Sequence, residues 1–290
     1  MKTILKLSAL LLLVTVYSFG RSIEDIKASG EIIIAVYEDF PPYSFKENGE
    51  LKGIDVELGK KVAKSLNVKP VWYLTGFDEN LAADLRNTIW RGNKVHKNKA
   101  DVMFRIPYDY EYMRLTDKQT GELQNEMVTI KGPYQCEKWV IATHKDKIPE
   151  IKTLGVFAYE TIGVEVDMLP DLHLSGFARG LIQKNIKHYM KFSDAIEDFK
   201  SGKIAAIAGL KAQLEYLIDY KHNKDKYYIS DGIPQMNSKW DLATAVHSSF
   251  RALSYHIDGV IEEAYQDNSI KKIFESYNVE YIPPIARTQQ

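Results

Sequence analysis

Hydrophobic and polar positions change their period sharply between residues 31 and 66. Residues Ile32 to Val36 are an unbroken run of β-branched and small apolar side chains, which is typical of a strand buried on both faces. Pro41 and Pro42 end the run, because proline cannot donate to a strand ladder. Asn48-Gly49 then supplies a hairpin turn. From residue 54 to 66 the apolar residues recur at helical spacing, which predicts an amphipathic helix.

Strands and helices continue to alternate along the chain. We expect further strands at residues 68–74, 100–104, 139–143, 154–157, 161–164, 186–190, 204–208, 227–229 and 243–246. Helices are expected at 81–90, 172–182, 211–220, 254–263 and 269–277, and from Ser193 as N-cap to Gly202. The tail after residue 282 is expected to be loose. Such alternation implies right-handed crossovers and largely parallel sheets.

The first twenty residues differ from the rest of the chain. Lys2 and Lys6 precede a Leu/Val-rich run from Leu7 to Val16, and Ser18-Phe19-Gly20 offers small residues for a signal peptidase. We interpret residues 1–20 as a cleaved export signal, with a retained membrane anchor as the alternative. No later segment is apolar enough to span a membrane. The mature protein is therefore expected to be soluble in the periplasm, without a stable membrane anchor.

Length and charge narrow the class of protein. A chain of 290 residues with 45% hydrophobic and 27% charged residues is typical of a globular protein of about two domains. The whole chain has 38 basic and 39 acidic residues, and loss of two lysines with the signal gives a net charge of −3. This balance argues against nucleic acid or an anionic membrane as a partner.

Motifs of catalysis, cofactor binding and metal binding are missing from the sequence. We find no phosphate-binding glycine loop, no nucleophile elbow and no pair of histidines at metal-ligand spacing. Cys136 is the only cysteine, so it cannot form an internal disulfide, and a buried or idle thiol is favoured over a catalytic one. We therefore expect a binding protein rather than an enzyme, with no cofactor and no metal.

The ordered set FPPYSF, a short hairpin and GIDVEL running into a helix resembles the opening of the periplasmic solute-binding proteins of family 3. That family includes the amino-acid receptors of ABC transporters. The resemblance implies an α/β, two-lobed type II periplasmic binding fold, in which each lobe is a mostly parallel sheet flanked by helices and two hinge strands join the lobes. Lobe one would span 21–135 plus 243–290, lobe two 136–242, with the first crossing near 133–138.

The resemblance also implies a ligand gripped between the lobes by aromatic walls and a few polar anchors. The residues that it places there are Glu38, Asp39, Phe40, Tyr43, Phe77, Arg105, Pro107 and Tyr108 in lobe one, and Glu165, Asp167, Met168, Gly209, Lys211 and Gln213 in lobe two. Among them, Arg105 would be the principal anchor for an anion, and Phe40, Tyr43 and Phe77 would form the walls.

The chain departs from the amino-acid receptors at three positions that hold an α-amino acid. Their S-x-T-x-x-R segment corresponds here to RIPYDYEYMR, with arginines at Arg105 and Arg114 instead. Their Gly-Thr-Thr corresponds to Val166-Asp167-Met168, and Gly209 occupies the place of the aspartate that holds the ligand ammonium. These departures argue against a standard amino acid as the ligand.

The segments DLRNTIWRG, ADVMFRIP, GPY and PDLHLSGFARGLIQKNIKHY resemble a divergent branch encoded beside periplasmic quinoprotein alcohol dehydrogenases. We expect an exported, non-catalytic protein that closes over a small polar or anionic solute for uptake through an ABC permease. The alternative is a periplasmic accessory protein that binds a quinoprotein dehydrogenase or its cytochrome through the aromatic-rich region 108–134. An enzyme is a third possibility, because a few relatives of this fold resemble periplasmic dehydratases.

Overall fold

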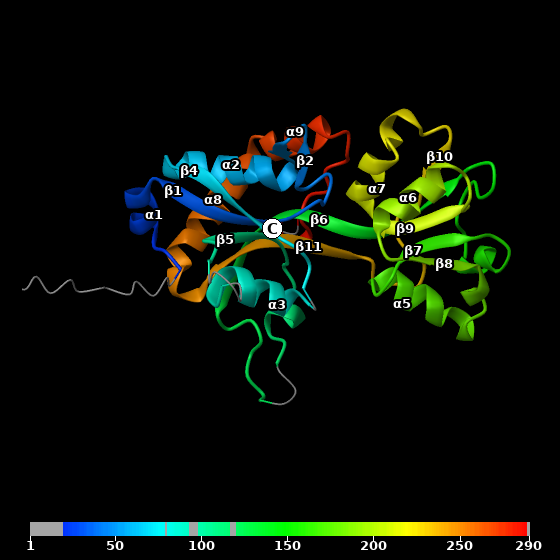
Figure 1. Cartoon of the computed structure of the whole chain (residues 1–290), viewed down its shortest axis with the longest axis horizontal. Coiled ribbons are helices and arrows are strands. Elements are labelled where there is room, and N and C mark those ends of the chain that lie inside the picture. Colours follow the sequence, from blue (N-terminus) through cyan, green and yellow to red (C-terminus); the bar gives the residue numbers. More distant parts are fainter. Residues whose placement is uncertain (1–19, 79, 93–97, 117–119, 289–290) are drawn as a thin grey trace, which may run out of the picture.

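Two bodies of helices and strands lie side by side in the computed structural model, and two long strands run between them (Figure 1). The structure describes residues 20–78, 80–92, 98–116 and 120–288. The expected export signal therefore lies almost wholly outside the described residues. We call the body that holds β1 lobe one and the body that holds β7 lobe two. In the described part of the chain, no helix has the length and apolar character needed to cross a membrane.

Lobe one is built on three parallel strands, because β1 pairs with both β4 and β5. The apolar run that the sequence predicts as a buried strand is β1, where Ile32, Ile34 and Ala35 have no exposed surface. The elements of this lobe are α1 (Ile23–Ser29), β1 (Glu31–Tyr37), β2 (Phe45–Glu47), β3 (Glu50–Lys52), α2 (Ile54–Leu66), β4 (Lys69–Thr75), α3 (Leu81–Leu85), η1 (Arg86–Trp90), β5 (Val102–Pro107), α4 (Tyr110–Met113), η6 (Ser248–Phe250), α8 (Arg251–Gln266), α9 (Ser269–Ser276) and α10 (Ile285–Thr288).

The apolar face of α2 packs on this sheet, and its entry depends on one glycine. Ile54, Leu58 and Val62 of α2 join Ile34 in the main core cluster of the lobe. Gly53 before the helix has φ of 134°, and a Cβ there would lie 2.1 Å from the carbonyl oxygen of Tyr43. Only glycine lets the chain pass so close to the aromatic loop. The hairpin and helix expected from the sequence are confirmed.

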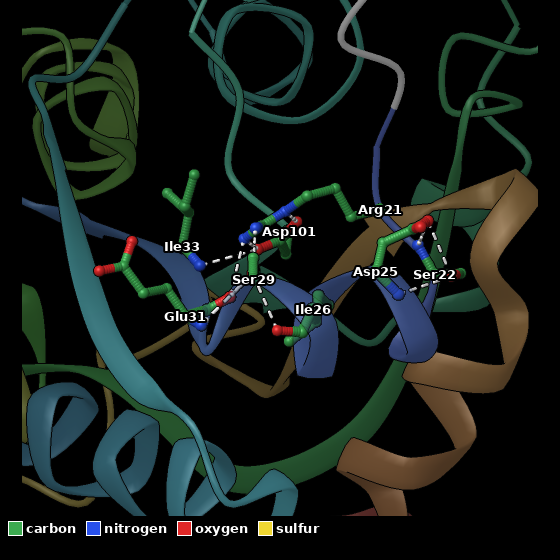
Figure 2. A network of polar contacts seen from close by, with 8 residues as sticks. All are labelled: Arg21, Ser22, Asp25, Ile26, Ser29, Glu31, Ile33 and Asp101. Atoms are coloured by element: carbon green, nitrogen blue, oxygen red, sulfur yellow. Dashed lines mark hydrogen bonds and ion pairs between the residues drawn. The ribbon is translucent and has the colours of Figure 1, made fainter.

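The start of the described chain is fastened to lobe one by Arg21 (Figure 2). The guanidinium of Arg21 donates to both carboxylate oxygens of Asp101, with 2.9 Å between Nε and Oδ1. Asp101 is 5% exposed, and its Oδ2 also accepts the backbone N–H of Ile33 at 2.7 Å. A forked guanidinium is well suited to a carboxylate held away from water. This network joins the residue before α1 to β1 and to the segment that enters β5.

Lobe two has a parallel core of its own, in which β7 pairs with β8 and β9. Its elements are η2 (Leu154–Ala158), β7 (Ile162–Glu165), α5 (Leu169–Gly176), η3 (Phe177–Arg179), η4 (Gln183–Asn185), β8 (Ile186–Tyr189), α6 (Phe192–Lys200), β9 (Ala206–Leu210), α7 (Lys211–Leu217), η5 (Tyr220–His222) and β10 (Tyr227–Ile229). The core lies on both faces of this sheet, with Phe157 and Leu174 in one cluster and Phe199 and Leu214 in the other.

The two long strands are β6 (Val128–His144) and β11 (Lys239–His247), which pair antiparallel and are shared by both lobes. At one end β11 pairs with β5 of lobe one, and at the other β6 pairs with β9 and β10 of lobe two. The sequence predicts a strand over residues 139–143 alone, whereas the strand β6 of the structure already begins at Val128. Gly132, with φ of 71°, and a register shift opposite residues 242–244 let β6 bend without ending.

Three other expectations are wrong. Residues 154–157 form a 3-10 helix rather than a strand, since Thr153 accepts a hydrogen bond from the backbone N–H of Gly155 and caps a tight turn. The helix expected over 172–182 begins at Leu169 and ends at Gly176, followed by 3-10 turns. α6 begins at Phe192 with Lys191 as N-cap, so Ser193 is inside the helix and not its cap.

The C-terminal tail is tied down rather than loose. The carboxylate of Asp241 on β11 accepts the backbone N–H groups of Ile285 and Ala286, each at 2.8 Å, and so caps α10. Arg287 pairs with Asp258 at 2.7 Å and also with Glu262 of α8, and it donates to the carbonyl oxygen of Pro133 at 2.7 Å. Sequence periodicity misses this because all of the partners are distant in the chain.

Candidate ligand-binding cleft

A cleft of about 840 Å³ lies between the lobes, and both lobes and both shared strands contribute to its lining. From lobe one it receives the residues that follow the carboxyl ends of β1, β4 and β5, and from lobe two the end of β7 and the start of α6 and α7. The carboxyl ends of parallel strands are where α/β folds bind ligands, because the connecting loops diverge there. Trp139 of β6 and Trp240 of β11 line the cleft at the crossing.

An aromatic wall covers the lobe-one side. The rings of Tyr37 and Phe77 stack with 4.2 Å between their centroids and 19° between their planes. Phe40 meets Phe77 edge-on at 5.2 Å. Phe77 is 57% exposed although it is large and apolar. An exposed aromatic held by two ring contacts at a cleft is an apolar surface available to a ligand.

The crossing strands and lobe two supply the remaining apolar surface. Trp139 and Trp240 lie 5.8 Å apart between ring centroids, at 40°. The indole Nε1 of Trp139 is buried and has no hydrogen-bond partner among the described residues. On the lobe-two side Phe192, Met168 and Met190 line the cleft, and Met190 is 83% exposed. Apolar side chains of lobe one, of the crossing strands and of lobe two therefore line the cleft.

Arg105, the expected anion anchor, lies in the lining, but its charge is already paired. Its Nη2 lies 3.2 Å from Oε2 of Glu137, and both side chains are buried. The guanidinium also lies over the ring of Tyr43, with 3.5 Å from Cζ to the centroid. A cation–π contact of this kind and a buried ion pair both hold the group in place. Nη1 is buried without a hydrogen-bond partner among the described residues.

A β-bulge sets the direction of Arg105. Across β5 and β11, Ile106 is opposite Ala243 and Met103 is opposite Ala245, so two residues of β5 face the single Thr244. Arg105 has φ of 68°, a left-handed conformation that is unusual for a residue with a side chain. Because the bulge interrupts the alternation of side chains along β5, the guanidinium lies against the polar cluster below the cleft.

Beneath the cleft, Arg105 and Glu137 belong to a buried polar cluster. The hydroxyl of Tyr43 donates a hydrogen bond to Oε2 of Glu137. The same oxygen accepts a second hydrogen bond from Nε2 of Gln135, at 3.1 Å. The hydroxyl of Tyr134 donates to Oδ1 of Asp55 at 3.1 Å. Burial raises the pKa of Asp55 to about 7, and the positive charge of Arg105 opposes this rise.

Burial alone would lower the pKa of Arg105, but the acidic groups around it, Tyr43 and Asp55 among them, raise it above its ordinary value. Arg105 therefore stays charged inside this cluster. One arginine and one glutamate cancel, and any ionisation of Asp55 makes the cluster negative. The cluster therefore contributes no net positive charge to the cleft.

Glu165 and Gln213 are the polar side chains of lobe two that line the cleft and are not exposed to solvent. Burial raises the pKa of Glu165 above its ordinary value, and a hydrogen bond from the backbone N–H of Phe192 opposes the rise. No basic side chain in the described part of the chain pairs with Glu165. Gln213 is 8% exposed and also lines the cleft.

The structure places eight of the fourteen residues predicted for the site in the lining, namely Asp39, Phe40, Phe77, Arg105, Pro107, Glu165, Met168 and Gln213. Outside the lining are Glu38, Tyr43, Tyr108, Asp167, Gly209 and Lys211. Lys211 is instead paired with Glu280 at 2.7 Å and with Glu215, which ties α7 to the segment after α9. A Cβ at Gly209 would lie 2.5 Å from the ring of Phe192, so this glycine makes room for a wall residue. Ligand contact by any of the fourteen stays a prediction.

Sequence reasoning missed several lining residues. They are Tyr37, Leu81, Trp139, Met190, Phe192 and Trp240. Tyr37 is the last residue of β1 and Phe192 is the first residue of α6. Ends of strands and starts of helices are common places for ligand contacts in α/β folds, so these two could have been selected from the sequence. The two tryptophans are inside strands, and their place at the crossing follows only from how the strands pair.

A cleft between two α/β lobes that share a pair of crossing strands defines the class of proteins that bind a small solute by hinge closure. The chain belongs to the bacterial extracellular solute-binding proteins, family 3, whose model matches residues 32–280. Family membership and the two-lobed α/β fold expected from the sequence are thus confirmed. The resemblance to the quinoprotein-associated branch and the expected lobe boundaries stay predictions.

The relatives are similar in both sequence and structure. The arginine-binding periplasmic protein of Mannheimia haemolytica is 20% identical over 255 residues, which cover 87% of this chain and 93% of that protein. A solved ancestral cationic amino acid solute-binding protein superposes with a TM-score of 0.68 at 19% identity, covering 88% of this chain and 99% of the other. An amino acid ABC transporter substrate-binding protein from Streptococcus pneumoniae, bound to L-arginine, has a TM-score of 0.61 at 17% identity and covers 90% and 100%. These structures share the fold.

Proposed function

We propose that this protein is an exported receptor that closes its two lobes over a small organic solute and delivers it to an ABC-type permease. The observation that carries the proposal is the cleft of about 840 Å³ that both lobes and both crossing strands line. Rotation about β6 and β11 changes the width of the cleft and leaves the two cores intact. Membership of family 3 supports the same role.

A solute without net negative charge fits the cleft better than the anion that the sequence suggests. Arg105 is neutralised by Glu137, and Lys211 is engaged with Glu215 and Glu280 outside the lining. The relatives whose names include arginine or a cationic amino acid support the same sign of charge. In the proposed function the protein catalyses no reaction, needs no cofactor and binds its solute in the periplasm.

A ligand screen combined with a measurement of closure tests this function. Thermal unfolding of the mature protein is measured with a panel of amino acids, amines, sugars and organic acids. A solute at a hundred times its Kd stabilises by about 2.7 kcal/mol, which raises Tm by about 5–10 °C in a chain of this size. Small-angle scattering with the same compound is expected to show a smaller radius of gyration.

Two variants show whether the effect arises in the cleft. Phe77→Ala removes an exposed aromatic of the wall, and Tyr159→Ala removes a still more exposed aromatic of lobe two that is outside the lining. The thermal shift is expected to fall in the first variant and to persist in the second. A panel without any stabilising compound, or a shift that both variants keep without closure of the lobes, refutes the proposed function.

A further inference from the structure

The charges of the cleft lining favour a cation. The described lining holds three carboxylates, Asp39, Glu165 and Glu197, and two basic residues, Arg105 and Lys191. Arg105 is cancelled by Glu137 within the buried cluster, and Lys191 is exposed to solvent. An unpaired carboxylate gains most from a partner where it is least hydrated. Glu165 is that carboxylate, because it is half-buried and no basic side chain of the described residues pairs with it.

The same lining offers a carboxylate of the ligand no buried cation that is free to pair with it. A carboxylate that enters the cleft would meet three like charges, and Lys191, the lining cation that lies outside the buried cluster, is exposed to water, where its attraction is screened. The donor left unused by Arg105, its Nη1, is buried below the rings of Phe40 and Tyr43, whose centroids lie 5.1 Å and 3.5 Å from Cζ. An α-amino acid therefore lacks a partner for one of its two charges.

The apolar surfaces suit the body of a cationic ligand. The stacked pair of Tyr37 and Phe77, at 4.2 Å, forms one wall, and Trp139 with Trp240, at 5.8 Å, forms another. The faces of aromatic rings carry negative potential, so they attract an ammonium group while they cover the carbon atoms attached to it. Gln213, whose side chain lines the cleft, offers a hydrogen bond to one further polar atom.

We propose that the cleft takes an organic amine whose cationic head pairs with Glu165 and whose apolar or aromatic body lies against the ring walls, and that it discriminates against a ligand carboxylate. This proposal deepens the proposed function and rests on it. It names the substrate class, which is an amine without a carboxylate, and the residue that provides its counter-charge.

Matched pairs of compounds test the proposal. Tryptamine, phenethylamine and agmatine differ from tryptophan, phenylalanine and arginine only by loss of the carboxylate. Binding of all six to the mature protein is measured by titration calorimetry at pH 7. At least one amine is expected to bind, and every amine that binds is expected to bind at least tenfold more tightly than its parent amino acid. Tighter binding by the parent amino acid overturns the proposal.

A charge variant tests the role of Glu165. Glu165→Gln keeps the shape of the side chain and is expected to weaken amine binding at least tenfold, whereas Glu150→Gln, an exposed carboxylate of lobe two outside the lining, is expected to leave it unchanged. The Tm of each free variant reports whether it folds. Equal affinity in Glu165→Gln and wild type overturns the assignment of that residue.

The outcomes separate this inference from the function on which it rests. If amino acids close the lobes and the amines do not bind, the substrate class is wrong and the proposed function stands. Binding of none of the six compounds also overturns the substrate class. The proposed function fails only if the wider panel gives no ligand either.

Discussion

The buried cluster below the cleft predicts that Asp55 makes the protein less stable as the pH rises. Asp55 is fully buried, and the hydroxyl of Tyr134 donates to its Oδ1 while Oδ2 has no partner among the described residues. Burial raises the pKa of this carboxyl from 3.8 to about 7. The perturbation is Asp55→Asn, which retains an acceptor for Tyr134 and removes the titration.

The sign and size follow from proton linkage. Between pH 4 and pH 7 the folded protein holds a proton on Asp55 that the unfolded chain releases, so stability falls as the pH rises through this range. Each pKa unit corresponds to about 1.4 kcal/mol, and the difference between 3.8 and about 7 corresponds to about 4 kcal/mol. Below about pH 4 and above about pH 7 this group contributes no further change.

Urea unfolding at pH 4 and pH 8, followed by tryptophan fluorescence, measures the effect. The stability of Asp55→Asn relative to wild type is expected to rise by about 4 kcal/mol from pH 4 to pH 8, because other titrating groups cancel in the comparison. Asp225→Asn, at an exposed position, serves as the control and is expected to show no such rise. A rise below about 1 kcal/mol in Asp55→Asn would refute the reasoning.

Two further substitutions test contacts made by residues of the crossing strands, namely Glu137 of β6 and Asp241 of β11. Glu137→Gln leaves the guanidinium of Arg105 buried without its counter-charge. Urea unfolding at pH 7 is expected to show that the free energy of unfolding falls by about 3–5 kcal/mol. A fall below about 1 kcal/mol would contradict the buried pair. Asp241→Asn weakens the cap of α10, so hydrogen exchange of the amides at Ile285 and Ala286 is expected to be about tenfold faster, a change of about 1.4 kcal/mol. Unchanged exchange would show that the tail is held by other contacts.

Much of the fold of lobe one follows from local patterns. The apolar run of β1, the period of α2 and the turn at Asn48-Gly49 each fall within about a dozen residues, and each is where the sequence predicts it. Local reasoning fails where a segment is stabilised by distant partners. The tail of α10 is held by Asp241, and β6 continues through residues 131–138 because β11 pairs with it on the far side of the chain.

The candidate site divides in the same way. Phe40 and Phe77 follow strand ends, so the rule that ligands lie at the carboxyl ends of strands selects them from the sequence. The role of Arg105 as an anion anchor was also inferred from its place in the chain. The structure gives Arg105 a partner, Glu137, that is 32 residues away and lies on the next strand but one. Spacing along the chain contains no information about such a pair.

By itself the sequence determined the α/β class and the region of chain from which a site is built, because these depend on the period of apolar residues and on the places where strands end. The two-lobed arrangement followed from the resemblance of the opening segment to family 3. The tertiary structure alone decided the charge of the cleft. That charge depends on which ionisable groups neutralise one another, and a bulge in β5, a bend in β6 and the pairing of β11 bring Arg105 against Glu137 and leave Glu165 unpaired. Electrostatic interactions follow distances in space, and those exist only once the chain has folded.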